Sequence, residues 1–168
     1  KPNGVGFSAV VSLGVSADID FGDVLDFLAT DHRTESIILY IEGIRNSRRF
    51  MSALRSAARI KPILLLKAGR HAAGSAAVRA HSGMHAGADS VFDAAVRRAG
   101  VVRVKNVGQL FYAAKALASK FRPQGRRLAI VSNGGGPGAM AADRAADLGL
   151  TLAELSPETI KTLNALLP

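Results

Sequence analysis

The chain has 168 residues, of which 48% are hydrophobic and 21% charged, a balance that can bury a globular core. It has no cysteine, which excludes disulfides and thiolate chemistry and suits a reducing cytoplasm, and no apolar run reaches the roughly 20 residues that span a bilayer. A net charge of +9 favours anionic partners, but only 5% of residues are aromatic, too few for the stacking surface of a single-strand nucleic-acid binder. We therefore expect a cytoplasmic protein that acts on small molecules rather than on nucleic acid or membranes.

In chain order, apolar runs typical of strands alternate with segments that have the periodicity of helices. Strands are expected over 6–13, 36–41, 63–67, 101–104, 127–132 and 151–155. Helices are expected over 21–29, 47–59, 72–81, 89–99, 107–120, 138–148 and from Pro157 onward. Four side chains suit the N-cap positions of these helices, namely Asp20, Asp89, Asn106 and Ser156. Most basic residues are expected on the solvated faces of the helices.

The alternation predicts an α/β fold, with a parallel sheet whose strands are joined by right-handed crossovers. The polar and basic segment 121–127 interrupts the pattern and contains Pro123 and Gly125, so we place a domain boundary there. The expected domains are 1–121 and 122–168. Because the chain begins at Lys1 rather than Met, we interpret it as a fragment or a processed product of a longer protein.

A glycine-rich segment, SNGGGPG at 132–138, joins an expected strand to an expected helix. The free N–H groups and the dipole of a helix start favour an anion, so this segment is a candidate phosphate site. It is neither a Walker motif nor a dinucleotide-binding fingerprint. The alternative is a tight turn between strand and helix with no ligand.

Two further residues suggest chemistry. Glu42 follows the apolar strand 36–41, where a carboxylate needs a partner, and it could orient a histidine or pair with Arg45 or Arg70. His81 lies in the small-residue stretch AHSGMHAGAD at 80–89, which leaves its imidazole open to a ligand. It is either a nucleophile that carries a phosphoryl group or a plain loop histidine. The histidine spacing fits no standard zinc pattern, so no metal site is expected.

Four runs carry a resemblance to a known family: LYIEGI at 39–44, KAGR and AGSAAVRAHSG within 67–83, RRAGVVRV at 97–104, and RLAIVSNGGGPGAMAAD at 127–143. They resemble the nucleoside-diphosphate-forming acyl-CoA synthetases, with ADP-forming acetate–CoA ligase as the nearest kind and succinyl-CoA synthetase as a broader relative. The resemblance covers nearly the whole chain and keeps the motif order. It implies a flavodoxin-like domain followed by the first half of a second, similar domain.

The resemblance also implies a reaction and a site. In this family an acyl phosphate is made from acyl-CoA and phosphate, and its phosphoryl group passes to a histidine and then to ADP. His81 occupies the phosphohistidine position, and Glu42 matches the glutamate that orients the histidine. The expected phosphate-binding residues are Asn133, Gly134, Gly135, Gly136, Gly138, Ser82 and Gly83.

The chain departs from the family pattern in a few places. Ser82 and Ala80 stand where Thr and Ser are usual, and His85 stands at a usually apolar position for which we have no account. The resemblance further implies that the first strand of the flavodoxin-like domain and the glycine turn after it are missing. The CoA-binding domain and the ATP-grasp module, which binds ATP or ADP with Mg²⁺, are likewise outside the chain, so it would bind phosphate at most.

Two expectations follow from this truncation. The fragment alone should be inactive, and an incomplete sheet should make copies of the chain associate or exchange strands as a homo-oligomer. An alternative function remains open: the chain could be the acyl-CoA-sensing regulatory region of a bacterial protein lysine acetyltransferase. Retention of His81 favours the synthetase.

Overall fold

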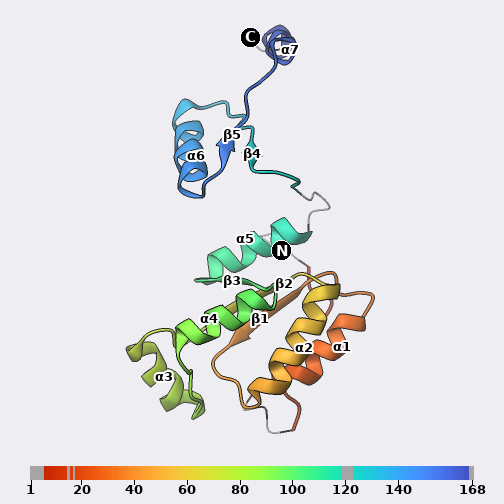
Figure 1. Cartoon of the computed structure of the whole chain (residues 1–168), viewed down its shortest axis with the longest axis vertical. Helices are drawn as coiled ribbons and strands as arrows, with labels where there is room; N and C mark the ends of the chain where they lie inside the picture. Colours follow the sequence, from red (N-terminus) through yellow and green to blue (C-terminus); the bar gives the residue numbers. More distant parts are fainter. Residues whose placement is uncertain (1–5, 15, 17, 119–122, 167–168) are drawn as a thin grey trace. The chain divides into compact units, whose positions relative to one another are not determined.

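The computed structural model describes residues 6–14, 16, 18–118 and 123–166. The chain divides into two compact units, Lys1–Lys120 and Phe121–Pro168. Figure 1 labels the helices and strands of both units. Each unit has a parallel sheet of its own among the described residues.

The sheet of the first unit has the order β1 (Ile37–Ile41), β2 (Ile63–Lys67), β3 (Val102–Val104), and all of its pairs are parallel. Every residue of the inner strand β2 is buried, as its continuous apolar run predicts. Ile41 lies opposite Lys67 in the register, so the carboxyl ends of β1 and β2 meet at one edge of the sheet. The predicted parallel sheet is confirmed.

The described helices of the first unit follow the predicted segments closely: α1 (Phe21–Thr30), α2 (Ser47–Ile60), α3 (Ala72–Ser82), α4 (Asp89–Arg98) and α5 (Val107–Ala118). Asp20 caps α1 as predicted, because its Oδ1 accepts a hydrogen bond from the backbone N–H of Gly22 at 2.7 Å. Asn106 serves α5 in the same way, accepting from the N–H of Gln109 at 2.8 Å. The last two residues of the predicted helix 107–120 lie outside the described residues.

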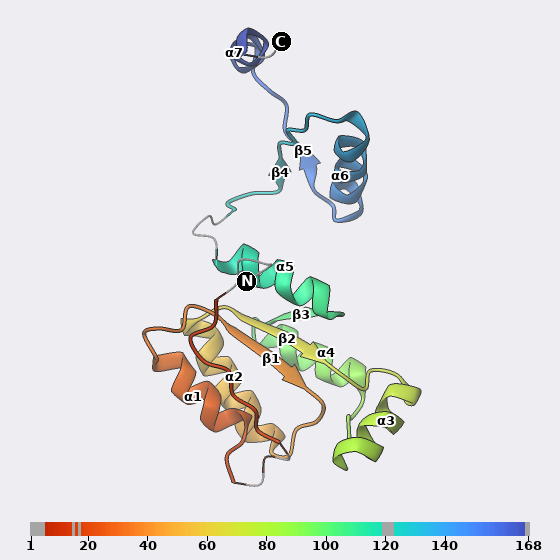
Figure 2. The ribbon, with the colours of Figure 1, turned by 180° about the vertical axis from the view of Figure 1, so that it is seen from behind.

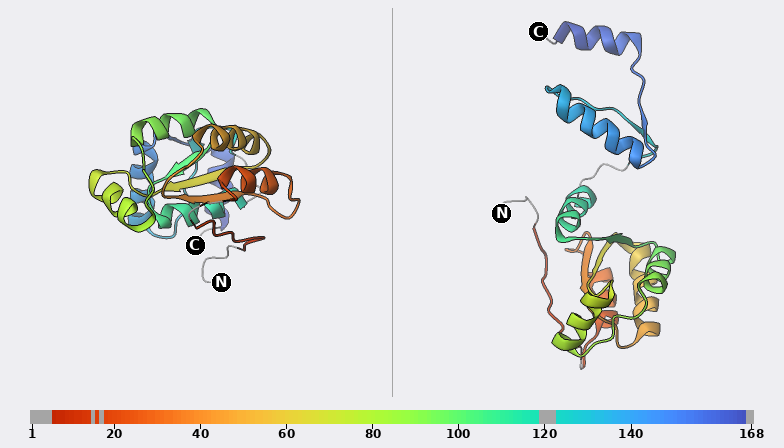
Figure 3. Two further views of the ribbon diagram at one scale, coloured as in Figure 1. Left: turned by 90° about the horizontal axis from the view of Figure 1, so that it is seen from below. Right: turned by 90° about the vertical axis from the view of Figure 1, so that its left-hand side faces the viewer.

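Helices cover both faces of this sheet. On one face, α1, α2 and α4 pack Leu25, Phe50 and Val96 against the odd-numbered side chains of β1 and β2. On the other face, α5 packs Leu110 and Ala114 against the even-numbered side chains of β2. The left-hand view of Figure 3 shows α5 on the opposite side of the sheet from α2 and α4. These two layers leave the ends of the strands as the place where loops can form a site.

The predicted strand over 6–13 is wrong, because residues 6–14 are extended but pair with no described strand. Figure 2 shows this segment running along the first unit. Phe7 is 59% and Val10 84% exposed, and a hydrogen bond of 2.9 Å between the hydroxyls of Ser8 and Thr34 holds the segment to the unit. A strand exists only where a neighbour satisfies its backbone groups, and a cavity lies between this segment and the edge strand β1.

The second unit contains β4 (Arg127–Leu128), α6 (Gly135–Asp147), β5 (Thr151–Leu152) and α7 (Pro157–Leu166). β4 and β5 pair in parallel over two residues each, so the predicted strands 127–132 and 151–155 are shorter than expected. The reason is that no third described strand pairs with them. Ser156 caps α7 as predicted, accepting from the N–H of Thr159 at 3.2 Å. Among the described helices, none is both long and apolar enough to cross a membrane.

Candidate functional site

His81 and Glu42 meet at the carboxyl ends of the strands of the first unit. Glu42 directly follows β1, and His81 lies in the last turn of α3. Nδ1 of His81 is 3.5 Å from Oε2 of Glu42, while 80% of the histidine side chain and 26% of the glutamate side chain are exposed. One edge of the imidazole therefore faces the carboxylate, and the rest of the ring is open to solvent. Among the described residues, neither Arg45 nor Arg70 forms an ion pair with Glu42.

The end of α3 explains why His81 stands at the surface. Gly83 has a φ of +68°, the left-handed conformation that glycine adopts readily at a helix C-terminus, and its N–H donates to the carbonyl of Arg79 at 3.0 Å. Ser82 donates its hydroxyl to the carbonyl of Val78 at 3.1 Å. Ser82 and Gly83 were both predicted to bind phosphate, and both use these donors in hydrogen bonds to carbonyls of α3. They follow His81 directly in sequence.

The segment 83–88, which follows His81, packs closely on the ends of two strands. A Cβ added at Gly43, just after β1, would lie 2.7 Å from Cβ of Met84 and 3.3 Å from the carbonyl oxygen of His85. A Cβ at Gly69, just after β2, would lie 2.9 Å from Cβ of Ala86. Only glycine permits this approach at both positions. The segment after the histidine is therefore fitted to the same strand ends that carry Glu42.

A cluster of charged side chains lies at the far end of this segment, and sequence reasoning missed it. Nη2 of Arg103 is 2.5 Å and Nζ of Lys67 3.7 Å from Oδ1 of Asp89, and Nη1 of Arg103 is 3.1 Å from Oδ1 of Asp93. The ring of Phe92 lies below both cations, 5.4 Å from Nζ of Lys67 and 5.3 Å from the guanidinium carbon of Arg103. The one available signal was a lysine closing an otherwise apolar buried strand, which must find a counter-charge.

Asp89 is not the N-cap of α4, contrary to the sequence prediction. Ala88 holds the cap position without a side-chain hydrogen bond, and Asp89 is the first helical residue. Two cations draw its carboxylate away from the helix N–H groups. Burial raises the pKa of Asp89, but the hydrogen bond and charge of Arg103 outweigh burial and hold that pKa below its ordinary value. Burial lowers the pKa of Lys67, because desolvation disfavours its ammonium form.

Acid should weaken the fold through these carboxyls. Hydrogen bonds from Arg97 and then Arg103 hold the pKa of Asp93 below its ordinary value of about 3.9. A carboxyl with a lower pKa in the folded state stabilises the fold above its unfolded pKa, and this stabilisation is lost as pH falls through the folded pKa. We therefore expect the urea midpoint of the full-length protein to fall below about pH 4, and Asp93→Asn to make that fall shallower. Identical pH dependence of the two midpoints would contradict this prediction.

A cavity of about 1070 Å³ opens beside the His81–Glu42 pair. It lies between the extended segment 6–14 and β1, and Phe21 and Val24 of α1 and Ala114 of α5 also line it. Helices from both faces of the sheet thus border a space along the free edge of β1. Its lining includes Glu42 and His81, so whatever fills the cavity lies next to the pair.

The predicted glycine-rich site belongs to the second unit. Gly134 is the N-cap of α6, and Ser132 closes the turn by accepting from the N–H of Gly134 at 3.2 Å and donating to its carbonyl at 2.8 Å. The helix begins at Gly135, earlier than predicted, because Pro137 fits a first turn where its missing N–H is not needed. The N–H groups of Gly135 and Gly136 have no partner among the described residues. Asn133 and Gly138 flank these two donors in sequence.

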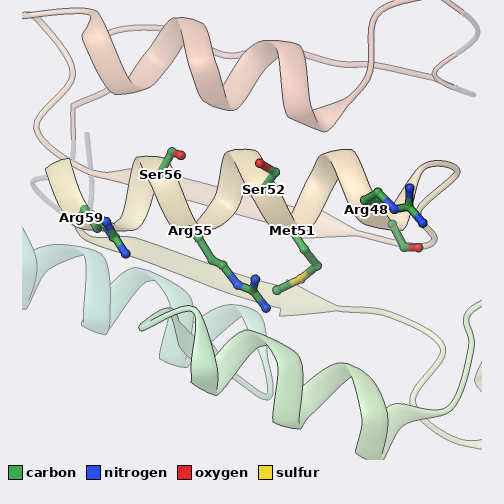
Figure 4. Close-up of a pocket in the computed structure, with 7 residues that line it drawn as sticks. Arg48, Met51, Ser52, Arg55, Ser56 and Arg59 are labelled. Atoms are coloured by element: carbon green, nitrogen blue, oxygen red, sulfur yellow. The ribbon is translucent and has the colours of Figure 1, made fainter.

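The remaining candidates do not add chemistry to the pair. No group of three or more potential metal ligands occurs among the described residues. His85 is exposed next to Met84, and its role remains without an account. Figure 4 shows a second, shallow pocket along α2, lined by Ser47, Arg48, Met51, Ser52, Arg55, Ser56 and Arg59. Its arginines are exposed on the solvated face of the helix, as predicted, and no titratable acid lines it.

Comparison with known proteins places the chain in a family. The family model described as "Succinyl-CoA ligase like flavodoxin domain" matches residues 1–117. The acetate–CoA ligase [ADP-forming] I of Archaeoglobus fulgidus is 45% identical over 168 residues, which are 100% of this chain and 24% of that protein. The alpha subunit of acetate–CoA ligase [ADP-forming] I of Pyrococcus furiosus is 44% identical over 148 residues, 88% of this chain and 32% of that subunit.

A solved structure agrees with these relatives. The dinucleotide forming acetyl-coenzyme A synthetase 1 of Ca. Korarchaeum cryptofilum, in complex with phosphate and ADP, superposes with a TM-score of 0.89 at 34% identity. The match covers 99% of this chain and 36% of that one, so the chain spans between about a quarter and about a third of the proteins that it matches. These relatives are ligases, and the resemblance and flavodoxin-like fold expected from sequence are confirmed. The chain belongs to the succinyl-CoA ligase-like flavodoxin domain family.

Proposed function

We propose that this chain carries the phosphohistidine relay of an ADP-forming acyl-CoA synthetase, with His81 as the phosphoryl carrier and Glu42 as the residue that orients it. The observation that carries the proposal is the contact of 3.5 Å between Nδ1 of His81 and Oε2 of Glu42, at the strand ends of a domain whose relatives are acetate–CoA ligases. The whole reaction converts acyl-CoA, phosphate and ADP into the acid, CoA and ATP.

The contact supports a different role for each ring nitrogen. With its proton on Nδ1 facing Glu42, the imidazole has a lone pair on Nε2, on the exposed side of the ring. Nε2 attacks the phosphorus of an acyl phosphate, the N–P bond forms as the P–O bond to the acyl group breaks, and the carboxylate leaves. ADP then attacks the same phosphorus, which regenerates neutral His81. Glu42 stabilises the positive charge that develops on the ring in each transfer.

We propose phosphate-binding residues in each unit separately. In the second unit, Gly135 and Gly136 offer free backbone donors at the start of α6, flanked by Asn133, Gly134 and Gly138. A helix of 13 residues has a dipole whose positive end favours a phosphate there. In the first unit, we propose that Ser82 and Gly83 lie beside the phosphoryl group on His81, because they follow that residue directly in sequence.

The remaining substrates need parts of the longer protein. We propose that the CoA-binding domain, and an ATP-grasp module that holds the nucleotide with Mg²⁺, lie outside this chain, which covers 24% of the acetate–CoA ligase of Archaeoglobus fulgidus. We further propose that the domains run from 1 to 121 and from 122 to 168, the second being the first half of another flavodoxin-like domain. We also propose that the protein acts in the cytoplasm.

We expect the fragment alone to be inactive because its substrate domains lie elsewhere, and the cavity beside β1 supports a second expectation, that the sheet lacks a strand. We propose that the cavity holds the first strand of the flavodoxin-like domain, supplied by the longer protein or by strand exchange between copies of the chain. In a protein extended to include that strand, the strand should pair with residues 6–13 on one side and with β1 on the other. We expect the extended protein to raise the thermal midpoint of the first unit, and the 168-residue chain to associate and to form no acyl-CoA.

Calorimetry and sedimentation of the two proteins check this prediction. If the 168-residue chain is a monodisperse monomer with the same thermal midpoint as the extended protein, the proposal that the cavity holds a missing strand is contradicted. Turnover of substrate by the fragment would contradict its expected inactivity.

A measurement on the full-length protein separates the proposal from its alternative. Mixed with acyl-CoA and labelled phosphate but no ADP, a synthetase accumulates up to one phosphate per active site, which ADP then discharges as ATP. A regulatory region of an acetyltransferase would bind acyl-CoA but form neither product. Absence of both products would reject the proposed function.

A further inference from the structure

We propose that Asp89 is a positioning residue for His81, because its ion pairs with Lys67 and Arg103 fix the far end of the segment that follows the histidine. This inference rests on the proposed function, since it assigns a task to residues that do not touch the phosphoryl group. Neither Asp89 nor Arg103 is among the residues assigned to the proposed site.

The segment 83–88 has few internal constraints of its own. Gly83 and Gly87 both have positive φ, +68° and +64°, and a Cβ added at either would meet no atom within 4 Å. Glycines in open space leave the backbone many alternative conformations. The conformation must therefore be imposed from outside the segment, by its contacts at Gly43 and Gly69 and by whatever holds Asp89 at its end.

The cations that hold Asp89 are largely buried, while 31% of the Asp89 side chain is exposed. Lys67 is 3% exposed, so its ammonium needs the carboxylate 3.7 Å away, and Arg103 adds a hydrogen bond of 2.5 Å to the same oxygen. Loss of one partner from a buried ion pair leaves an uncompensated charge, which costs far more than loss of an exposed pair. The lowered pKa of Asp89 agrees with a carboxylate that stays ionised in this position.

The topology links this attachment to Glu42. Lys67 is the last residue of β2 and lies opposite Ile41, the residue before Glu42. The N–H of Ala68, next to Lys67, donates to the carbonyl of Ile41 at 2.9 Å. Adjacent, hydrogen-bonded strand ends therefore hold both the acid that contacts His81 and the cation that holds Asp89. A shift of Asp89 moves the histidine segment relative to the acid that orients it.

Asp93 provides a matched control. It also binds Arg103, at 3.1 Å, and also pairs with Arg97, but it lies one turn inside α4 rather than at the end of the segment. Asp93→Asn thus removes a carboxylate from the same cluster without releasing residues 83–88. If the cluster serves stability alone, Asp89→Asn and Asp93→Asn should reduce activity only in proportion to their loss of stability.

The test uses the full-length protein with Asp89→Asn, Asp89→Glu and Asp93→Asn. Because a misplacement of about 1 Å can cost about 100-fold in rate, we expect Asp89→Asn to slow single-turnover phosphorylation of His81 at least tenfold. It should also speed amide hydrogen exchange in 83–88, while Asp89→Glu restores most of the rate and Asp93→Asn changes it less than about twofold. Equal slowing by Asp89→Asn and Asp93→Asn, or unchanged exchange in Asp89→Asn, would overturn the inference.

Failure of the proposed function gives a different result. If the unsubstituted protein forms no phosphohistidine, the function is rejected, but the exchange measurement still tests whether Asp89 holds the segment. If Asp89→Asn does not fold, Arg103→Lys decides, because it keeps the charge of the cluster but replaces the guanidinium that donates to Asp89. Exchange in 83–88 of this variant identical to that of the unsubstituted protein would then contradict the role.

Discussion

Replacing His81 with Asn in the full-length protein is expected to abolish protein-bound phosphate and to lower ATP formation by at least about 1000-fold, since removal of a covalent nucleophile has effects of this size or larger. Asn keeps a polar side chain of similar reach but has no nitrogen lone pair that can attack phosphorus. The fold should survive, because 80% of the His81 side chain is exposed. Acid-labile phosphate and the coupled formation of ATP are the measurements.

His85→Asn is the matched control for this prediction. His85 lies in the same loop, is exposed, and forms no ion pair among the described residues, so its loss should leave both measurements within about twofold. Retention of phosphate and activity in the His81 variant would reject His81 as the carrier. Loss of activity in the His85 variant instead would move the chemistry to the neighbouring ring.

The largest effect on stability is expected from Phe50→Ala. Phe50 is 1% exposed at the centre of the layer formed by α1, α2 and the sheet, and its ring meets that of Phe21 edge to face at 6.2 Å. Truncation of a buried phenylalanine removes its transfer free energy and leaves a cavity, so the free energy of unfolding should fall by about 3–5 kcal/mol. Urea unfolding of the full-length protein measures this change.

Phe27→Ala is the control for the core. Phe27 lies on α1 and is 61% exposed, so the same truncation there should change the free energy of unfolding by no more than about 0.5 kcal/mol. Similar losses for the two variants would mean that the layer between α1, α2 and the sheet does not form the core of the unit.

The sequence predicted those parts of the fold that depend on local pattern. The apolar runs of β1 and β2 and the cap at Asp20 each have a local cause, and the structure has all three. The segment 6–13 has an equally apolar pattern, but a strand also needs a neighbour, and a cavity lies where that neighbour would pair. The pattern of a segment cannot report whether its partner is present.

The site was predictable to the extent that its residues follow strands or end helices. Glu42 and His81 were candidates by their positions in the chain, their roles were implied only by the family resemblance, and the topology brings them within 3.5 Å. The cluster of Lys67, Asp89 and Arg103 could not be found in this way, because its members come from β2, α4 and β3 and only the folded sheet brings them together. The sequence predicted Asp89 as a helix cap and most basic residues on solvated faces, and it predicted no contact among the three.

The most direct test of the phosphohistidine relay is to locate the phosphate itself. The full-length protein is incubated with acyl-CoA and phosphate without ADP, quenched at alkaline pH where phosphohistidine survives, and its peptides are sequenced by mass spectrometry. We expect the phosphate on His81, within the stretch 80–89, and its complete discharge on addition of ADP. Phosphate on any other residue, or ATP formation with no phosphate on His81 at any time, would contradict the relay.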